Sequence, residues 1–279
     1  MLWFKKKTSI KTCAGIGDIL HTKAQLDQIR DDYDRISIGY DDSLVSRFRS
    51  DDDQYRIFLD GLFKLLFSEQ PYHRDQHIKA QCKNPEALWE SGFQPIVPDL
   101  SHLLALRTSI PDEPYIVIST KIRGIKRAQY EELRPDFLNV LRLLSKKSIV
   151  VLLGERTIGY NAEYKCHGSE LIYSIYTDVL SATQDGKLLD LTVPELGLTA
   201  PSLIRFRNEC FIQQKALRVI TIGSGGNVSI AMSVGKIIGF YAHSEMERFF
   251  TVMLQNTKNR RVCLLRDKQE FLGSILSLA

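Results

Sequence analysis

The stretch Arg218-Val-Ile-Thr-Ile-Gly-Ser-Gly-Gly-Asn-Val-Ser-Ile-Ala-Met-Ser-Val-Gly-Lys-Ile-Ile-Gly-Phe-Tyr241 predicts a strand, a glycine-rich turn, a short helix and a second strand. Residues 219–222 form a β-branched run of the kind found in buried parallel strands. Gly223, Gly225 and Gly226 allow a sharp turn and a close approach of the backbone to a ligand. A turn that opens a helix gathers unpaired N–H groups and so suits a phosphate, although an ordinary strand-to-helix connection would show the same pattern.

The strand-then-helix order recurs along the whole chain. Ile110-Pro-Asp-Glu-Pro114 interrupts it and suits a domain boundary. Repeated βα order indicates parallel sheets covered by helices. We therefore expect an α/β protein of two Rossmann-like, doubly wound domains, 1–110 and 111–279, that face a central cleft. Strands are expected at 8–14, 36–40, 115–119, 149–153, 188–191, 219–222, 237–241 and 261–265, helices at 19–29, 51–67, 135–144, 170–180, 202–210, 244–254 and 268–278, and loops with short helices at 70–100.

The composition is that of a globular protein and excludes several classes. A formal charge of +4 with scattered basic residues does not indicate nucleic-acid binding. No apolar run reaches membrane-spanning length. The five cysteines are widely spaced and form no C-x-x-C pair, which argues against a zinc site or a disulfide framework and favours a reducing compartment. We expect a cytoplasmic protein.

The N-terminal segment Met-Leu-Trp-Phe-Lys-Lys-Lys7 has no long apolar region after it, so it does not resemble a signal peptide. Trp3 and Phe4 beside three lysines could contact an anionic membrane surface, which would place the protein at the inner face of a membrane. The alternative is a solvated edge of the first strand. The sequence leaves both open.

Gly15-Ile-Gly17-Asp18 follows the first predicted strand. A dinucleotide-binding fingerprint needs a third glycine three residues after Gly17, and Leu20 stands there instead. Asp18 is a carboxylate at the C-terminal edge of a strand, where ligands of open α/β sheets bind. It could equally be the N-cap of the following helix.

Three segments carry a resemblance to a known family. Ala14-Gly-Ile-Gly-Asp-Ile-Leu-His-Thr22 resembles the Gly-Asp-(Val/Ile)-Leu-x-Thr opening of the lipopolysaccharide heptosyltransferases, which are inverting glycosyltransferases of the two-domain GT-B fold. Ser119-Thr-Lys-Ile-Arg-Gly-Ile-Lys126 is similar to the Thr-x-x-x-Lys-x-Trp segment that opens the second domain of that family. Residues 223–235 resemble its Asp-(Ser/Thr)-Gly-x-x-His donor loop. The three occur in the family's order across most of the chain.

The resemblance implies roles for individual residues. Asp18 would be the general base, because the acceptor hydroxyl must lose its proton as it displaces the nucleoside diphosphate. Lys126 and the turn at 223–227 would stabilise the leaving diphosphate without a metal or another cofactor. Glu155 could hold a ribose hydroxyl. The implied site is completed by Gly17 and His21 toward the acceptor and by Thr120, Ser224, Gly225, Gly226 and Asn227 toward the donor.

The chain departs from the family in the donor loop. Ser224 stands where the family has Asp, and Ser229 where it has His. These departures argue against ADP-heptose and favour another nucleotide sugar on the same scaffold, with hexosyl, pentosyl and heptosyl transfer all open. The partners implied are a nucleotide-sugar donor and a glycan or glycolipid acceptor, as in surface polysaccharide assembly.

Two rival functions and one rival site remain. A nucleotide-sugar epimerase would use the same fold but needs a second acid in the cleft, and the sequence offers no clear candidate. A catalytically silent nucleotide-binding module would bind the diphosphate without transfer. His73 and His77 have the i, i+4 spacing of metal ligands on a helix, but no carboxylate or cysteine completes a set at diagnostic spacing.

Overall fold

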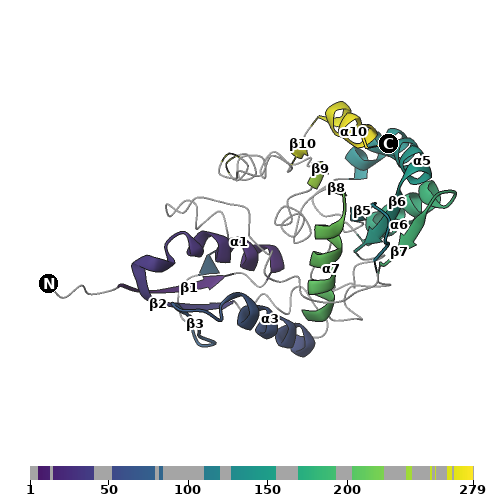
Figure 1. Ribbon diagram of the computed structural model, residues 1–279. Coiled ribbons are helices and arrows are strands. Elements are labelled where there is room, and N and C mark those ends of the chain that lie inside the picture. The colour runs from purple at the N-terminus through teal and green to yellow at the C-terminus, as the bar shows by residue number, and fades with distance from the viewer. Residues whose placement is uncertain are drawn as a thin grey trace.

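The computed structural model describes residues 6–12, 15–40, 52–78, 82–83, 110–119, 127–154, 169–192, 203–222, 237–240, 252, 255, 263–265 and 267–278. These residues form two parallel sheets (Figure 1). The prediction of an α/β protein with two parallel-sheet units is therefore confirmed.

The first sheet has the strand order β3-β2-β1-β4, with all neighbours parallel. Ile10, Ile36 and Ile38 lie on one face of this sheet and pack against α1 and α3 in a single buried core. Both helices cover the same face because both connections run in the same direction with right-handed crossovers. The elements are β1 (Lys6–Thr12), α1 (Ile16–Asp27), the 3-10 turn η1 (Arg30–Asp32), β2 (Tyr33–Tyr40), α3 (Asp52–Leu66), β3 (Tyr72–Arg74) and β4 (Cys82–Lys83).

The second sheet has the order β10-β9-β8-β5-β6-β7. Counted from β5, this is 6-5-4-1-2-3, the strand order of the dinucleotide-binding fold. One face packs against α5, α6 and α10, and the other packs against α7. The elements are β5 (Tyr115–Ser119), α5 (Arg127–Lys147), β6 (Ile149–Leu153), α6 (Ser169–Thr183), β7 (Leu188–Asp190), α7 (Leu203–Lys215), β8 (Arg218–Ile222), β9 (Ile237–Phe240), β10 (Cys263–Leu265) and α10 (Lys268–Leu276).

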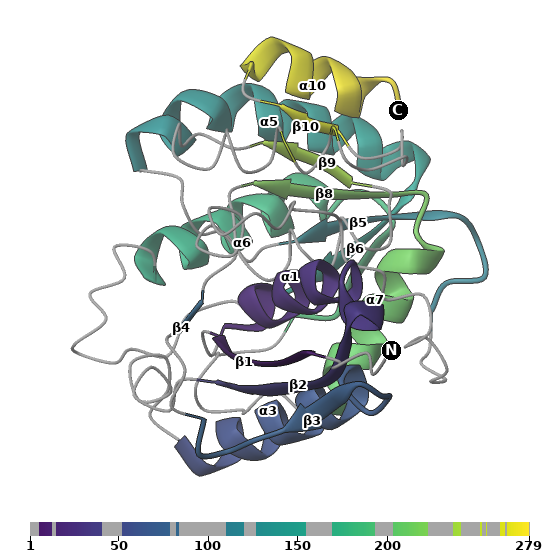
Figure 2. The ribbon, with the colours of Figure 1, turned by 90° about the vertical axis from the view of Figure 1, so that its left-hand side faces the viewer.

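Helix α7 packs against both units. Phe206 and Cys210 join the core of the first unit, whereas Ile212 and Ala216 join the core on the facing side of the second sheet. Each pair is spaced i, i+4, so the two contacts use two faces of one helix. Figures 1 and 2 both show α7 and α1 between the two sheets. Helix α7 therefore connects the two units, with the core of each unit on a different side of the helix.

Several predicted elements differ from the observed ones. The helix predicted at 135–144 with proline in its first turn is α5, which begins at Arg127 and carries Pro135 inside. An internal proline costs about 3 kcal/mol, and the buried stripe of Tyr130, Leu133, Phe137 and Leu141 outweighs this cost. The helix predicted at 202–210 is also too short, since α7 begins at Leu203 and continues to Lys215.

The prediction of loops and short helices at 70–100 is wrong for β3 and β4. Strands of two or three residues are too short to show a periodic pattern. His73 therefore lies in a strand and His77 in a turn, and the two do not share a helix face. Among the residues that the structure describes, no group of three His, Cys, Asp or Glu side chains could hold a metal ion.

Candidate functional site

Each sheet has a point where its strand order reverses, and ligands of open α/β sheets bind at the carboxyl ends of the strands there. In the first sheet this point lies between β1, which leads into α1, and β4. Thr12 and Lys83 pair at the carboxyl ends of the two strands. In the second sheet it lies between β5 and β8, where Ser119 pairs with Thr221.

Asp18 lies in the first turn of α1, directly after β1. The N-cap is Gly15, which makes no side-chain cap hydrogen bond, so the alternative of Asp18 as N-cap is wrong. Asp18 stands three residues after the cap, where a carboxylate is favoured by the helix dipole without being part of the cap itself. Its side chain is half-buried. The structure thus leaves Asp18 at the carboxyl edge of the first sheet, beside the point where the strand order reverses.

Gly15 makes room for the Asp18 carboxylate. Gly15 has φ −75° and ψ 139°, an extended conformation open to any residue, so the turn itself does not require glycine. A Cβ atom at this position would lie 2.6 Å from Oδ2 of Asp18. The absence of a side chain at Gly15 therefore lets the carboxylate fold back over the start of the helix.

His21 and Thr22 lie on the buried side of α1. His21 is 5% exposed, and the Thr22 hydroxyl hydrogen-bonds to that of Thr12 at 3.0 Å. This bond joins the last residue of β1 to the helix that carries Asp18. Gly17 is half-buried in the first turn. Of the residues implied for the acceptor side, His21 is enclosed and Gly17 and Asp18 are accessible.

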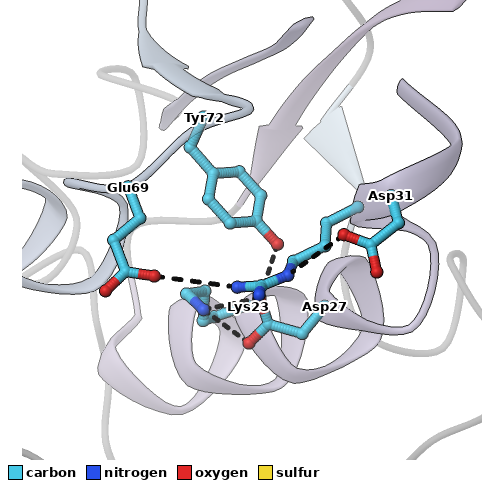
Figure 3. Close-up of polar contacts among 6 residues, drawn as sticks. Lys23, Asp27, Asp31, Glu69 and Tyr72 are labelled. Atoms are coloured by element: carbon cyan, nitrogen blue, oxygen red, sulfur yellow. Dashed lines mark hydrogen bonds and ion pairs between the residues drawn. The ribbon is translucent and has the colours of Figure 1, made fainter. Parts of the chain in front are cut away.

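A polar cluster holds the other end of α1 (Figure 3). Asp27 accepts hydrogen bonds from Lys23 Nζ at 2.6 Å and from Tyr72 Oη at 2.6 Å. Burial, followed by the contact with Asp27, raises the pKa of Tyr72 above its usual value, so the phenol stays a donor. Arg30 Nη1 lies 3.7 Å from Glu69 Oε2. These contacts join the C-terminal end of α1 to Tyr72 at the start of β3 and to Glu69 just before it.

The residues predicted to bind the donor lie next to elements that the structure describes. Thr120 comes directly after Ser119 of β5, Lys126 directly before Arg127 of α5, and Ser224 two residues after Ile222 of β8. Because β5 and β8 are neighbours, the two predicted donor segments leave adjacent strands at the same edge. Thr120, Lys126, Glu155, Ser224, Gly225, Gly226 and Asn227 themselves lie outside the described residues.

Gly154 follows β6 with φ 114°, a conformation that favours glycine. Its carbonyl oxygen accepts a hydrogen bond of 3.4 Å from Arg205 Nη2 of α7, and Arg205 Nε also bonds Glu209 Oε1 at 2.9 Å. The N-terminal turn of α7 thus reaches the carboxyl edge of the second sheet, next to the position from which Glu155 follows. Sequence reasoning missed Arg205, because an arginine inside a helix has no distinctive spacing.

Comparison with known proteins gives structural likeness only. No family model matches the chain, and no curated protein matches it significantly. Over 98% of both chains it is similar to the E. coli ADP-heptose lipopolysaccharide heptosyltransferase II, with 12% identity and a TM-score of 0.49. A family 9 glycosyltransferase from Veillonella parvula aligns over 100% of this chain and 98% of its own, with 11% identity and a TM-score of 0.47.

The glycosyltransferase TibC of enterotoxigenic E. coli aligns over 85% of this chain and 58% of its own, with 10% identity and a TM-score of 0.45. All three TM-scores lie below 0.5. The candidate site is therefore argued from the topology and side chains of this chain, and not from these likenesses.

Within the described part of the chain, no helix has the length and apolar character needed to span a membrane.

Proposed function

We propose that the protein is a GT-B-type glycosyltransferase that moves a sugar from a nucleotide-sugar donor to a glycan acceptor with inversion and without a metal. One observation carries the proposal: Asp18 lies at the reversal point of one parallel sheet, and both predicted donor segments leave adjacent strands at the reversal point of the other. Two such edges can bind one substrate each, the acceptor at one and the donor at the other.

The first sheet supplies the acceptor side. The acceptor oxygen attacks the anomeric carbon while the bond from that carbon to the diphosphate breaks, and the hydroxyl proton passes to a carboxylate oxygen of Asp18. Gly15 leaves room for that carboxylate, and the Thr12–Thr22 hydrogen bond fixes its helix against β1. These contacts support a positioned base, since a misplaced group loses much of its effect.

The second sheet supplies the donor side. Negative charge develops on the diphosphate as it leaves. Lys126 directly precedes α5, a helix of 21 residues whose N-terminal N–H groups and dipole favour anions. The glycine-rich segment that follows β8 would bring further N–H groups. Thr120, Ser224 and Asn227 would contact the phosphates or the sugar, and Glu155 a ribose hydroxyl.

Departures from the heptosyltransferase pattern at Ser224 and Ser229 favour a donor other than ADP-heptose. A panel of UDP-, GDP-, ADP- and CMP-sugars, measured by thermal shift, tests the proposal, because a ligand that binds only the folded state raises its melting temperature. At least one nucleotide sugar is expected to raise it, and the nucleotide that this donor releases (UDP, GDP, ADP or CMP) should compete. A panel without any shift would overturn the proposal.

Transfer itself is tested with the donor so identified. Release of the nucleoside diphosphate is expected to accelerate when a glycan acceptor is added. Binding of the diphosphate with no transfer to any acceptor would favour a silent nucleotide-binding module. Conversion of the donor sugar to its epimer would favour an epimerase.

A further inference from the structure

On the face of the second sheet toward α7, the row of side chains nearest the carboxyl edge is more polar than the row before it. The strand register places Val151, Val117, Val219 and Ile237 side by side on that face, and all four are fully buried. Two residues nearer the carboxyl edge, the next row on the same face is Leu153, Ser119, Thr221 and Gly239. An aliphatic row is thus followed by one with two hydroxyls and a glycine.

The opposite face does not change in this way. There the register aligns Leu152, Ile118, Ile220 and Ile238, all of them buried in the core beneath α5 and α10. The hydroxyls are therefore confined to one face and to the two strands, β5 and β8, between which the strand order reverses. That face also looks toward the first unit through α7.

In this row, Thr221 has a buried hydroxyl for which the described residues offer no hydrogen-bond partner. Its side chain is 1% exposed, and within the described part of the protein its Oγ1 is buried and makes no hydrogen bond. Other buried threonines are paired: Thr183 Oγ1 donates to the Val179 carbonyl oxygen at 2.8 Å, and Thr12 bonds Thr22. A buried hydroxyl without a partner is unfavourable relative to a valine of the same shape, so it calls for an explanation.

We infer that Thr221 is a ligand-binding residue whose hydroxyl donates a hydrogen bond to a phosphate oxygen of the bound nucleoside diphosphate. The inference rests on the proposed function and adds a residue to its donor site. A diphosphate presents only acceptor oxygens, which matches a hydroxyl with a proton to donate. Thr221 stands one residue before the end of β8, and its neighbour Gly239 on β9 has no side chain to occupy the space beside it.

The test compares the isosteric variant Thr221→Val with the wild type. Binding of UDP, GDP and ADP is measured by isothermal titration calorimetry, together with uridine, guanosine and adenosine. The wild type is expected to bind at least one diphosphate, and Thr221→Val to bind it about ten- to a hundredfold more weakly, the usual loss for a hydrogen bond to a charged group. Affinity for the matching nucleoside, which lacks phosphate, should not change. The melting temperature without nucleotide should be equal or higher in the variant.

Two further variants serve as controls. Thr221→Ser keeps the hydroxyl and is expected to retain diphosphate affinity within about threefold. Thr183→Val makes the same exchange at a buried threonine that is paired and lies in α6. It should lower the melting temperature and leave diphosphate affinity unchanged.

The outcomes separate this inference from the proposed function. If the wild type binds a diphosphate and Thr221→Val binds it equally well, Thr221 is no ligand contact and the proposed function stands. If Thr221→Val weakens the nucleoside as much as the diphosphate, the contact is not with phosphate, and the inference is wrong. If the wild type binds no diphosphate, both fail together.

Discussion

The buried hydroxyls of Thr12 and Thr22 lie 3.0 Å apart and join the end of β1 to α1, one turn of helix after Asp18. Both side chains are fully enclosed. A bond between two buried hydroxyls is asymmetric in its energetics, since loss of one partner leaves the other desolvated, whereas loss of both does not.

We expect Thr22→Val alone to lower the free energy of unfolding by about 1–3 kcal/mol, because it leaves the Thr12 hydroxyl unsatisfied. The double variant Thr12→Val/Thr22→Val should recover much of this loss, since two isosteric apolar groups then face each other. Chemical denaturation of the two single variants and the double variant measures the coupling. Additive losses would show that the hydroxyls act independently.

Asp18→Asn is expected to retain the fold and donor affinity, because Asn keeps the size of the side chain and the donor belongs to the other sheet. Turnover should fall by about 10²–10⁴, the usual contribution of a positioned base. Gly15→Ala provides a matched variant that keeps the carboxylate. Its backbone tolerates alanine, but the new Cβ would lie 2.6 Å from the Asp18 Oδ2 position and displace it.

Gly15→Ala should therefore slow transfer while the melting temperature stays close to that of the wild type, since a flexible side chain can move aside. Both variants are assayed for melting temperature and sugar transfer. Full activity of Asp18→Asn would remove Asp18 from the mechanism and leave the fold unaffected.

Lys126→Ala is expected to weaken nucleoside diphosphate binding about ten- to a hundredfold, the loss of one charge-assisted contact of about 1.5–3 kcal/mol. Acceptor binding should change little, because the acceptor is proposed to lie at the first sheet. Calorimetric titration with the diphosphate measures the effect, with Lys146→Ala in the last turn of α5 as the control. Unchanged affinity would shift the role to Lys121, Arg123 or Arg127.

Phe206→Ala tests the contact of α7 with the first unit. Phe206 is 3% exposed, and the centroid of its ring lies 6.2 Å from the ring centroid of Phe58 in α3. Removal of a buried aromatic ring costs about 3–5 kcal/mol, so a marked loss of stability is expected. Ile204→Ala in the same helix is the control, because Ile204 is 65% exposed and should change stability by less than about 0.5 kcal/mol. Equal effects of the two variants would contradict a shared core.

We expect the free energy of unfolding to fall at high pH because of Tyr115. Its hydroxyl donates to the Ile212 carbonyl oxygen at 2.7 Å, and burial raises its pKa from 10.0 to about 12. The unfolded chain therefore releases this proton first as the pH rises. The stabilisation is complete below pH 10 and is lost between about pH 10 and 12, by up to about 3 kcal/mol.

Tyr115→Phe is the comparison for this pH dependence, because lysines titrate in the same range. The variant should be about 1 kcal/mol less stable at neutral pH, where it lacks the hydrogen bond, and its stability should fall less steeply above pH 10. Parallel pH profiles for the two proteins would show that Tyr115 does not contribute. Urea denaturation across pH 7–12 supplies the data.

Much of the second sheet could be predicted from the sequence. The runs at 115–119 and 149–153 are short, aliphatic and bounded by turn residues, and both are strands with the predicted limits. Buried parallel strands need no partner-specific information to be recognised, since both faces of each strand require apolar side chains. Asp18 could be found in the same way, because a carboxylate after a strand and two glycines is visible in one local stretch.

Contacts between distant segments were decided only by the tertiary structure. Nothing local to Gly15 shows that it makes room for a carboxylate and is not needed for a turn. The two-sided packing of α7 depends on α3, since Phe206 packs against Phe58, which lies 148 positions earlier in the chain. The row of Ser119, Thr221 and Gly239 exists only in the register of three strands. Periodicity reports which side of one element is buried, whereas the identity of the neighbour is set by packing between elements, which no local pattern encodes.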